Sequence, residues 1–522
     1  MKSDMIVKLL FLILFFAVTI FIGFYTKKKS VDVNGFLMGG RAVGPWLTAF
    51  AYGTSYFSAV IFIGYAGQFG WRFGLAATWI GIGNTVIGSF LAWKILAKRT
   101  RTLSHYYDSA TMPDYFGKRF DSKGLKIAAS IIVFIFLIPY TASLFNGLSR
   151  LFTLAFGIDY VWCVVGMAVL TAIYVIAGGY MATAINDFIQ GLVMFFGIIL
   201  VVVAVIKTNG GFTAAINGLS AIDGGTGLQG AFSSFFGPEP LNLLFVVILT
   251  SLGTWGLPQM VAKFYAIKDD SAVVRGTTIS TIFALIVAGG CYFLGGFGRL
   301  YKDTIEYGAN GKPVFDSIVP QMISQLSPIL IGIVVILVLS ASMSTLSSLV
   351  LTSASTLTLD LIEPLRKTTA KKWENNKRIL IIRLFVAFFI IVSSVIAVVQ
   401  YKTNVAFIAQ MMGISWGALA GAFLAPYVYS LFSEKVSKGA VIVSFIFGTG
   451  IMVLQMALNF AGFAFENKIL AFIFASSINS GVVAMVSGLI FVPLVGLVTK
   501  NSKLRIASRT VFEETGLKEK KV

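Results

Sequence analysis

Long apolar segments follow one another along almost the whole chain, and they constrain the fold more than any other feature. A run of about 20 apolar residues is long enough to cross the hydrocarbon core of a bilayer as a helix. Charged residues are only 12% of the 522, about half their share in an average soluble domain. The sequence therefore predicts an all-α integral membrane protein with 13 transmembrane helices. The predicted spans are residues 5–25, 46–66, 74–97, 125–149, 159–177, 186–206, 241–263, 274–298, 326–359, 379–400, 404–431, 438–460 and 469–498.

The basic residues gather in alternate connections between these spans. Lys27, Lys28 and Lys29, for example, directly follow the first span. Because connections rich in Lys and Arg stay in the cytoplasm, we expect the N-terminus outside and the C-terminus inside the cell membrane. The same pattern accounts for the net charge of +19 without a nucleic-acid partner. The expected surroundings are a lipid bilayer.

The residues that enzymes and metal sites need are scarce. His105 is the only histidine, and no cluster of Cys and His has the spacing of metal ligands. Within the predicted spans we find no pair of acids and no nucleophile with a base. We therefore expect no catalytic residues and no enzymatic activity.

Two predicted spans are interrupted near their middles. Residues 51–59 (AYGTSYFSA) and 251–259 (SLGTWGLPQ) contain Gly, hydroxyl or Pro residues, and they lie five helices apart. Interrupted spans in corresponding positions of two halves indicate an inverted-repeat transporter, because an unwound turn frees carbonyl groups to bind a cation. The alternative is a pair of kinked helices that pack closely on their neighbours.

A third feature is a run of hydroxyl side chains in the ninth predicted span. Residues 340–348 (SASMSTLSS) carry six hydroxyls in nine positions. Ser344, Ser347 and Ser348 share one helix face, since residues three and four apart are neighbours. Neutral oxygens on an apolar helix suit a hard cation such as Na⁺. The alternative is that each hydroxyl bonds the carbonyl one turn back and lets helices pack closely.

Asp187 stands at the predicted start of the sixth span. An acidic group that enters a membrane helix is costly and often functional. The alternative is an interfacial charge favoured by the helix dipole. No basic residue is expected deep within a span to pair with Asp187, so a bound cation is its expected partner.

Together, four segments resemble the sodium/solute symporter family, which includes bacterial proline, pantothenate and monocarboxylate transporters and the sodium/sugar cotransporters. The segments are 34–41 (NGFLMGGR), 178–190 with Asp187 and Gln190, 256–264 (GLPQMVAKF) and 343–347 (MSTLS). The resemblance covers about residues 5 to 500. It implies one transporter domain over 1–522 with a LeuT-type 5+5 inverted repeat, formed by residues 46–206 and 241–431. One extra helix (5–25) precedes the repeat, two (438–498) follow, and 500–522 form a cytoplasmic tail.

The resemblance also implies site residues. The sodium ligands are expected to be the carbonyls of Thr54, Phe57 and Ala341 and the hydroxyls of Ser344 and Thr345. A second sodium site, present in only some relatives, is expected to use Asp187, Ser347 and Ser348. The substrate site is expected at Ser55, Tyr56, Tyr140, Thr250, Thr254, Trp255, Pro258 and Trp416.

The chain departs from the proline transporters within this set. Thr250 and Thr254 match a pocket tryptophan and tyrosine of those proteins, and Tyr56 matches an aspartate in the first break. These departures disfavour proline as the solute. The sequence from Trp255 to Pro258 is closer to the pantothenate and monocarboxylate transporters.

The expected function is sodium-coupled secondary active symport by alternating access. The solute is expected to be a small polar organic molecule, such as a carboxylate like pantothenate, a monocarboxylate or an amino acid, and Na⁺ the only cofactor. A proton-coupled or sugar-type symporter of the same fold is an alternative, although Asp187 without a buried histidine makes a poor proton relay. A channel or a membrane sensor is a further alternative.

Overall fold

The computed structural model describes residues 2–26, 32–223, 227, 229–308, 311–365, 375–403, 408–499 and 502–517. These residues form helices and connections, with two isolated β-bridges and no strand among them. The all-α fold class is therefore confirmed. The Lys27–Lys29 cluster, on which the expected orientation partly depends, lies outside the described residues.

Ten described helices are long and apolar enough to cross a membrane. Two of them have 47 and 49 residues, about twice the length of one crossing. Each is divided at a glycine with positive φ, Gly74 and Gly179. Dividing both, and counting the bent pair Pro240–Gly256 and Pro258–Tyr265 as one span, gives the thirteen crossings that the sequence predicts.

The elements that form the crossings are α1 (Lys2–Thr26), α3 (Pro45–Tyr56), η3 (Val60–Tyr65), α4 (Ala66–Phe73), α5 (Thr78–Gly83), η5 (Asn84–Leu91), η6 (Trp93–Ala97), α6 (Lys98–Tyr106), α8 (Lys123–Phe156), α9 (Tyr160–Thr208), α11 (Pro240–Leu252), η8 (Gly253–Gly256), α12 (Pro258–Tyr265), α13 (Asp270–Gly295), α15 (Pro328–Thr356), η10 (Leu357–Ile362), α17 (Asn375–Thr403), α18 (Ile408–Phe432), α19 (Lys438–Phe460) and α21 (Ser477–Val498). The remaining short elements are α2 (Val33–Met38), η2 (Gly39–Arg41), η4 (Gly74–Ala77), α7 (Met112–Arg119), α10 (Phe212–Ser220), η7 (Ala231–Ser233), η9 (Gly298–Tyr301), α14 (Phe315–Ser324), α16 (Glu363–Leu365), α20 (Lys468–Phe474) and α22 (Ser502–Glu514).

Several predicted span boundaries differ from the structure, and the starts of two spans differ most. The sixth span does not start at 186, because α9 continues helically through Tyr180 after the break at Gly179. The last span does not start at 469, because α20 is a separate short helix with exposed side chains and α21 begins at Ser477. The second error arises because the apolar residues of α20 precede the turn before α21.

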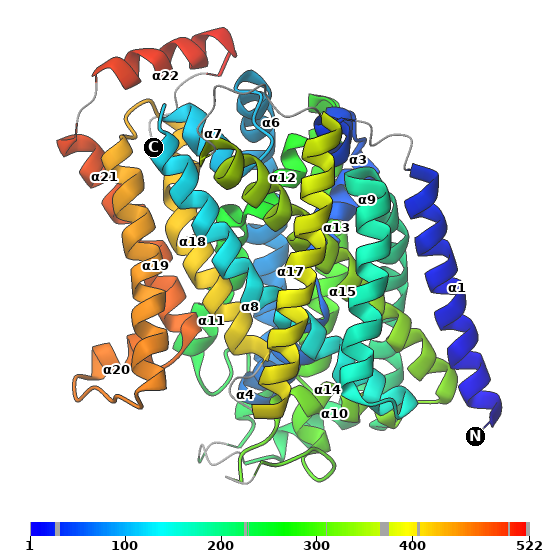
Figure 1. The fold of residues 1–522 in the computed structure, drawn as a ribbon. Coiled ribbons are helices and arrows are strands. Elements are labelled where there is room, and N and C mark those ends of the chain that lie inside the picture. The colour runs from blue at the N-terminus through cyan, green and yellow to red at the C-terminus, as the bar shows by residue number, and fades with distance from the viewer. Residues whose placement is uncertain are drawn as a thin grey trace.

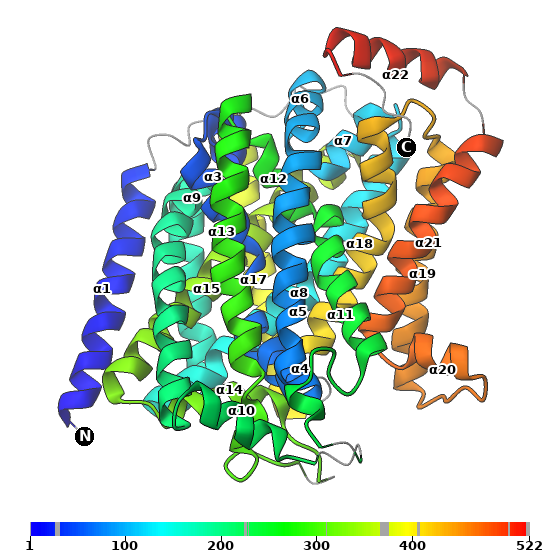
Figure 2. The same cartoon turned by 180° about the vertical axis from the view of Figure 1, so that it is seen from behind.

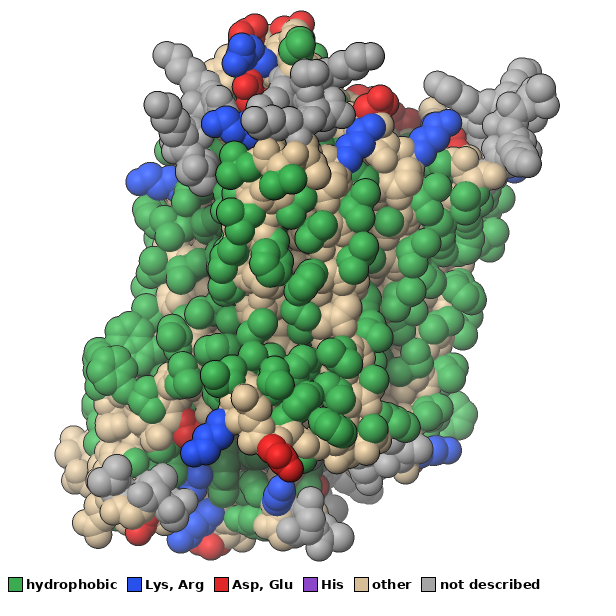
Figure 3. Space-filling model, turned by 90° about the vertical axis from the view of Figure 1, so that its left-hand side faces the viewer, with side chains coloured by type: hydrophobic (Ala, Val, Ile, Leu, Met, Phe, Trp, Pro, Cys, Tyr) green, Lys and Arg blue, Asp and Glu red, His purple; other side chains and the backbone are tan. Residues whose placement is uncertain are grey.

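The long helices run side by side in one bundle (Figures 1 and 2). Helices α6, α7 and α22 lie at one end of the bundle, which we call the α22 end, and α10, α14 and α20 lie at the other, the α14 end. The face in Figure 3 carries a broad band of hydrophobic side chains between charged residues at both ends. This band has the character of a lipid-facing surface, so the chain is a multi-pass membrane protein.

Helix α15 lies in the interior of the bundle, beside α9, α8 and α3. In its most apolar window 78% of residues are buried, against 28% for α1 at the edge. Because α15 has no lipid-facing side over most of its length, its hydroxyl run must find partners within the protein. The hydroxyl of Tyr174 on α9 fixes this region by donating to the carbonyl of Met343 at 2.6 Å.

Both predicted helix breaks are confirmed. Helix α3 ends at Tyr56 and Phe57 is extended (φ −88°, ψ 114°). The next helical segment starts on the carbonyl of Ser58, which accepts hydrogen bonds from the backbone of Ile61 and Phe62. In the other broken span Leu257 is extended (φ −85°, ψ 121°) because Pro258 disfavours the helical region for the residue before it. The two halves of that span meet at 45°.

Candidate functional site

The first helix break lies directly against the hydroxyl run of α15. The hydroxyls of Ser344 and Thr345 each lie 2.9 Å from the carbonyl oxygen of Thr54. Thr345 also lies 3.4 Å from the carbonyl of Phe57 and 3.1 Å from that of Ala341. The structure therefore brings all five expected sodium ligands together.

The chemistry of this cluster fits a sodium ion. Its ligand atoms are three carbonyl and two hydroxyl oxygens, which are hard, neutral donors of the kind that alkali and alkaline-earth cations prefer. The five residues are buried, so a bound ion would exchange its water for protein oxygens. The carbonyl of Phe57 is available because the residue is extended and leaves the helical hydrogen-bond ladder.

The expected second sodium site has a different structure. Asp187 is fully buried, and the ammonium of Lys263 lies 3.5 Å from its Oδ2. The same ammonium donates to the hydroxyl of Ser348 at 2.9 Å. The hydroxyl of Ser347 turns back to its own helix and donates to the carbonyl of Ser344. The expectation that no basic residue pairs with Asp187 was therefore wrong.

Three aromatic residues of the expected substrate site pack around one point in the interior. The ring of Trp416 on α18 lies 6.1 Å from that of Tyr56 and 6.0 Å from that of Tyr140 on α8. Among the described residues, the Tyr56 and Tyr140 hydroxyls, the Trp416 indole nitrogen and the Ser58 hydroxyl at the helix break make no hydrogen bond of ordinary length and angle. Ser58 and Trp416 are the polar neighbours of Tyr140. Buried polar atoms without partners are costly, so this cluster, the aromatic chamber, is suited to a polar ligand.

The other expected substrate residues make contacts of a different kind. The Ser55 hydroxyl lies 2.8 Å from that of Ser348, beside Lys263. The Trp255 indole donates to the carbonyl of Ile87. Thr250 and Thr254 donate to carbonyls one turn back in their own helix. Pro258 lines a cavity of about 30 Å³ on the α22 side of the breaks. None of these contacts joins them to the aromatic chamber.

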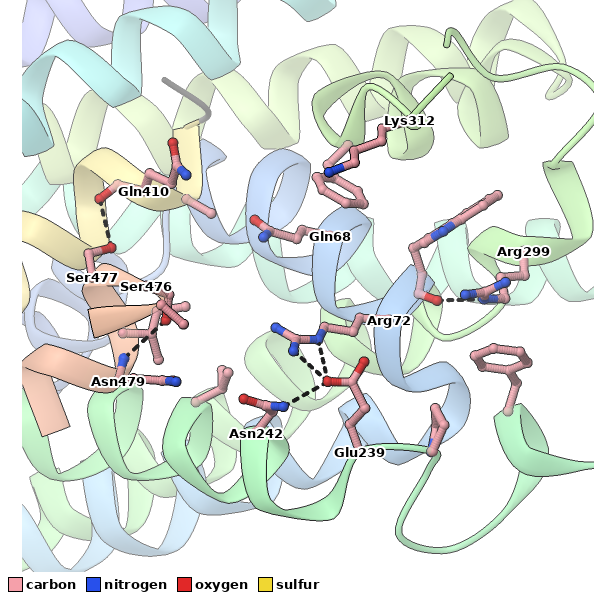
Figure 4. Close-up of a pocket in the computed structure, with 18 residues that line it drawn as sticks. Gln68, Arg72, Glu239, Asn242, Arg299, Lys312, Gln410, Ser476, Ser477 and Asn479 are labelled. Atoms are coloured by element: carbon pink, nitrogen blue, oxygen red, sulfur yellow. Dashed lines mark hydrogen bonds and ion pairs between the residues drawn. The ribbon is translucent and has the colours of Figure 1, made fainter. Parts of the chain in front are cut away.

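A cavity of about 600 Å³ opens at the α14 end, and Figure 4 shows the side chains that line it. Its wall includes Ala409 on α18, and Trp416 lies two turns further along that helix, about 10 Å deeper. The cavity is lined by residues of α4, α11, α14, α18 and α21, among them the halves of both broken spans that face this end. We call it the vestibule.

The charged side chains of the vestibule are mostly basic. They are Arg72, Arg299 and Lys312 against one acid, Glu239. Figure 4 shows Arg72 directed at Glu239, which also accepts a hydrogen bond from Asn242 at 2.7 Å. Glu239 is thus neutralised locally, and the net charge of the vestibule is positive.

Arg299 is held in place by aromatic residues rather than by an acid. Its guanidinium lies 3.7 Å from the ring centroid of Phe232 and 4.8 Å from that of Trp71, and its Nε donates to the Trp71 carbonyl. Burial lowers the pKa of Arg299 to about 10, which leaves it charged at neutral pH. It therefore contributes a fixed positive charge to the vestibule.

Sequence reasoning missed Lys263 and the vestibule arginines for separate reasons. Lys263 closes the predicted seventh span, where a lysine is typical of the membrane interface. The available signal was its position between the apolar residues Val261 and Phe264. Arg72 and Arg299 come from connections far apart in the chain, so their convergence has no local signature.

Comparisons with known proteins identify the family of this chain. The model of the sodium:solute symporter family matches residues 36–448. The osmoregulated proline transporter OpuE of Bacillus subtilis (strain 168) is 27% identical, over 91% of this chain and 94% of that protein. A sodium/proline symporter of Staphylococcus aureus (strain JH9) is 26% identical, over 85% of this chain and 84% of that protein. In fold, the chain is similar to a Na⁺-coupled sialic acid symporter in a substrate-bound outward-open state, with a TM-score of 0.74, 17% identity and coverage of 95% and 98%. The chain therefore belongs to the sodium:solute symporter family, and sodium is its coupling ion.

Proposed function

We propose that this protein imports a small organic carboxylate together with sodium by alternating access, with the α14 end facing outside. The proposal rests above all on one observation, the convergence of the Thr54, Phe57 and Ala341 carbonyls with the Ser344 and Thr345 hydroxyls. A sodium ion at this point joins the broken span to α15. Separation of the two elements removes ligands and releases the ion.

The orientation is supported by the charges at the two ends. Described basic residues crowd the α22 end, where Lys98, Arg101, Lys118 and Lys268 lie beside the short helices α6, α7 and α12. Positive residues near membrane helices favour the cytoplasm. On this orientation the vestibule is the entry from outside, and sodium moves inward with the membrane potential, which supplies about 2.3 kcal/mol per charge at 100 mV.

The solute class is supported by two features along one path. The vestibule has a net positive charge, which raises the local concentration of anions. The aromatic chamber, deeper in the bundle, offers one indole N–H and three hydroxyls that make no hydrogen bond of ordinary length and angle, and all four can donate to a carboxylate. Two relatives named for proline are consistent with a carboxylate solute. The threonines at positions 250 and 254 favour a solute other than proline.

A thermal-shift screen of the purified protein tests the proposal. Small carboxylates, including amino acids, monocarboxylates and pantothenate, are added in sodium chloride or in choline chloride. A bound ligand raises the unfolding temperature by mass action. We expect at least one carboxylate to stabilise the protein only with sodium, and the same compound to enter proteoliposomes under an inward sodium gradient. Sodium-independent binding, or uptake driven only by a proton gradient, contradicts the proposal.

A further inference from the structure

The buried ion pair of Lys263 and Asp187 lies where a second sodium ion is expected. Lys263 stands on α12, the α22-side half of the second broken span, and Asp187 stands on α9. Both side chains are almost completely buried, with relative exposures of 4% and 1%. The ammonium also lies 5.2 Å from the ring centroid of Tyr180. Asp187, Ser348 and the Tyr180 ring are all groups that attract a cation.

The ammonium takes the ligands that a sodium ion would need. It contacts Asp187 and Ser348, two of the three expected ligands of the second site. Ser348 in turn contacts Ser55 at the end of α3. The third expected ligand, Ser347, is bonded to its own helix. The residues present therefore do not fit a second sodium ion beside the lysine.

Charge balance leads to the same result. Asp187 and Lys263 together are neutral, and a neutral pair is the state that a buried site favours. A sodium ion added to this pair would leave a net positive charge within the membrane span and would lie next to the ammonium. The neighbouring first sodium site does not compensate this added positive charge, because it is built from neutral oxygens.

We propose that the Lys263 ammonium takes the place of a second sodium ion in this chain, so that one sodium ion is bound per transport cycle. The inference rests on the proposed function, since it presupposes sodium at the site of Thr54, Ser344 and Thr345. The tethered cation holds α12 against α9 and α15, and through Ser348 it reaches Ser55 on α3. It thereby joins the α22-side halves of both broken spans beside the small cavity that opens there.

Equilibrium binding of ²²Na⁺ to the purified full-length protein, with protein concentration determined independently, tests the number of sites. We expect one ion per wild-type protein and two for Lys263→Met, because removal of the ammonium leaves Asp187, Ser348 and Ser55 to bind a second ion. We expect one ion again for Lys263→Arg, which restores a tethered cation, and for the double variant Lys263→Met with Asp187→Asn, which removes both charges.

Asp187→Asn in the wild-type background tests the inference even if the lysine variants do not fold. On this inference Asp187 binds no sodium while Lys263 is present, so the variant keeps one bound ion. Two ions in the wild-type protein, one of them lost in Asp187→Asn, overturn the inference but leave the proposed function intact. One ion in Lys263→Met also overturns it. Absence of any bound ion in the wild-type protein contradicts the proposed function itself.

Discussion

The hydroxyl of Thr345 donates a hydrogen bond to the carbonyl oxygen of Thr54 at 2.9 Å, although the two residues are 291 positions apart. This contact joins the helix break at the end of α3 to the hydroxyl face of α15. The carbonyl is available because the helix stops at Tyr56, and the hydroxyl is directed at it because α15 is buried on all sides at this level. Relative movement of the two helices therefore changes the number of oxygens that converge here.

Removal of the two hydroxyls at this contact should weaken sodium binding. We expect the double variant Ser344→Ala with Thr345→Val to raise the sodium concentration for half-maximal uptake about 30-fold, since each lost neutral ligand costs about 1 kcal/mol. The valine keeps the shape of threonine. Initial rates of solute uptake into proteoliposomes at varied sodium concentration measure the effect.

Ser342→Ala is the matched control for that experiment. Ser342 is buried on the same helix, but its hydroxyl donates to the Val338 carbonyl one turn back and contacts neither broken span. We expect its sodium dependence to equal that of the wild-type protein. Equal sodium affinity in the double variant and in the control contradicts the assignment of the site.

The aromatic chamber should bind solute through its unpartnered polar atoms. Tyr140→Phe and Trp416→Phe each remove one hydrogen-bond donor and keep an aromatic ring. We expect each to raise KM for the solute about five-fold, equivalent to about 1 kcal/mol. Sodium-induced stabilisation without solute should not change, because the hydrogen bonds among the proposed sodium ligands involve neither side chain.

Tyr429→Phe serves as the control for the chamber variants. Tyr429 lies on α18 like Trp416, but its hydroxyl donates to the Leu489 carbonyl on α21. Its KM should remain that of the wild-type protein. Unchanged KM in both chamber variants places the solute elsewhere in the protein.

Local sequence signals were sufficient for the spans, for both breaks and for the hydroxyl run. The helix breaks within residues 51–59 and 251–259 are predicted by Gly, Ser and Pro residues that interrupt apolar helices. The contact between the first break and residues 341–345 could be predicted only from the family resemblance, since no local pattern indicates which helices lie side by side. The five proposed sodium ligands were thus predicted by analogy, and the structure brings these residues together.

The direction of a bend could not be read from the sequence. If the seventh span were straight, it would end near Lys263 and place the lysine ammonium at the membrane surface. The 45° bend at Leu257 instead directs α12 into the bundle and buries the lysine against Asp187.

The direction of the Trp255 side chain could not be read from the sequence either, because the 3₁₀ geometry of η8 changes which face of the helix the indole occupies. Its contact with the Ile87 carbonyl follows from that register.

The break at Gly179 should be intolerant of any side chain. The residue has φ 57° and ψ −151°, a region that is essentially restricted to glycine. A Cβ there would lie 2.7 Å from the carbonyl oxygen and the ring of Phe36. We expect Gly179→Ala to cost about 1–3 kcal/mol and to lower the unfolding temperature in detergent.

Gly166→Ala on the same helix is the control for backbone strain. Gly166 is helical, and an added Cβ meets nothing within 4 Å. Alanine favours a helix over glycine, so this variant should be as stable as the wild-type protein or slightly more stable. Equal losses in the two variants would mean that neither the positive φ nor the contact with Phe36 makes position 179 more sensitive than other glycines of α9.

The positive charge of the vestibule should accelerate the capture of an anionic solute. We expect Arg299→Gln to lower kcat/KM for the solute about five-fold at low ionic strength, because the charge that attracts the anion is removed. The loss should shrink as choline chloride is added at constant sodium, since the screening length falls to about 10 Å at 0.1 M salt. Initial uptake rates at low solute concentration measure kcat/KM directly.

Two further variants separate charge from packing in the vestibule. Arg299→Lys keeps the charge and should restore most of the rate, whereas loss of stacking on Trp71 and Phe232 would affect both variants equally. Lys302→Gln removes a positive charge from the same connection, but Lys302 is exposed and does not line the vestibule. Its effect on kcat/KM should be small at every salt concentration. If Lys302→Gln and Arg299→Gln lower the rate to the same extent, overall surface charge attracts the solute and the vestibule has no specific part in its capture.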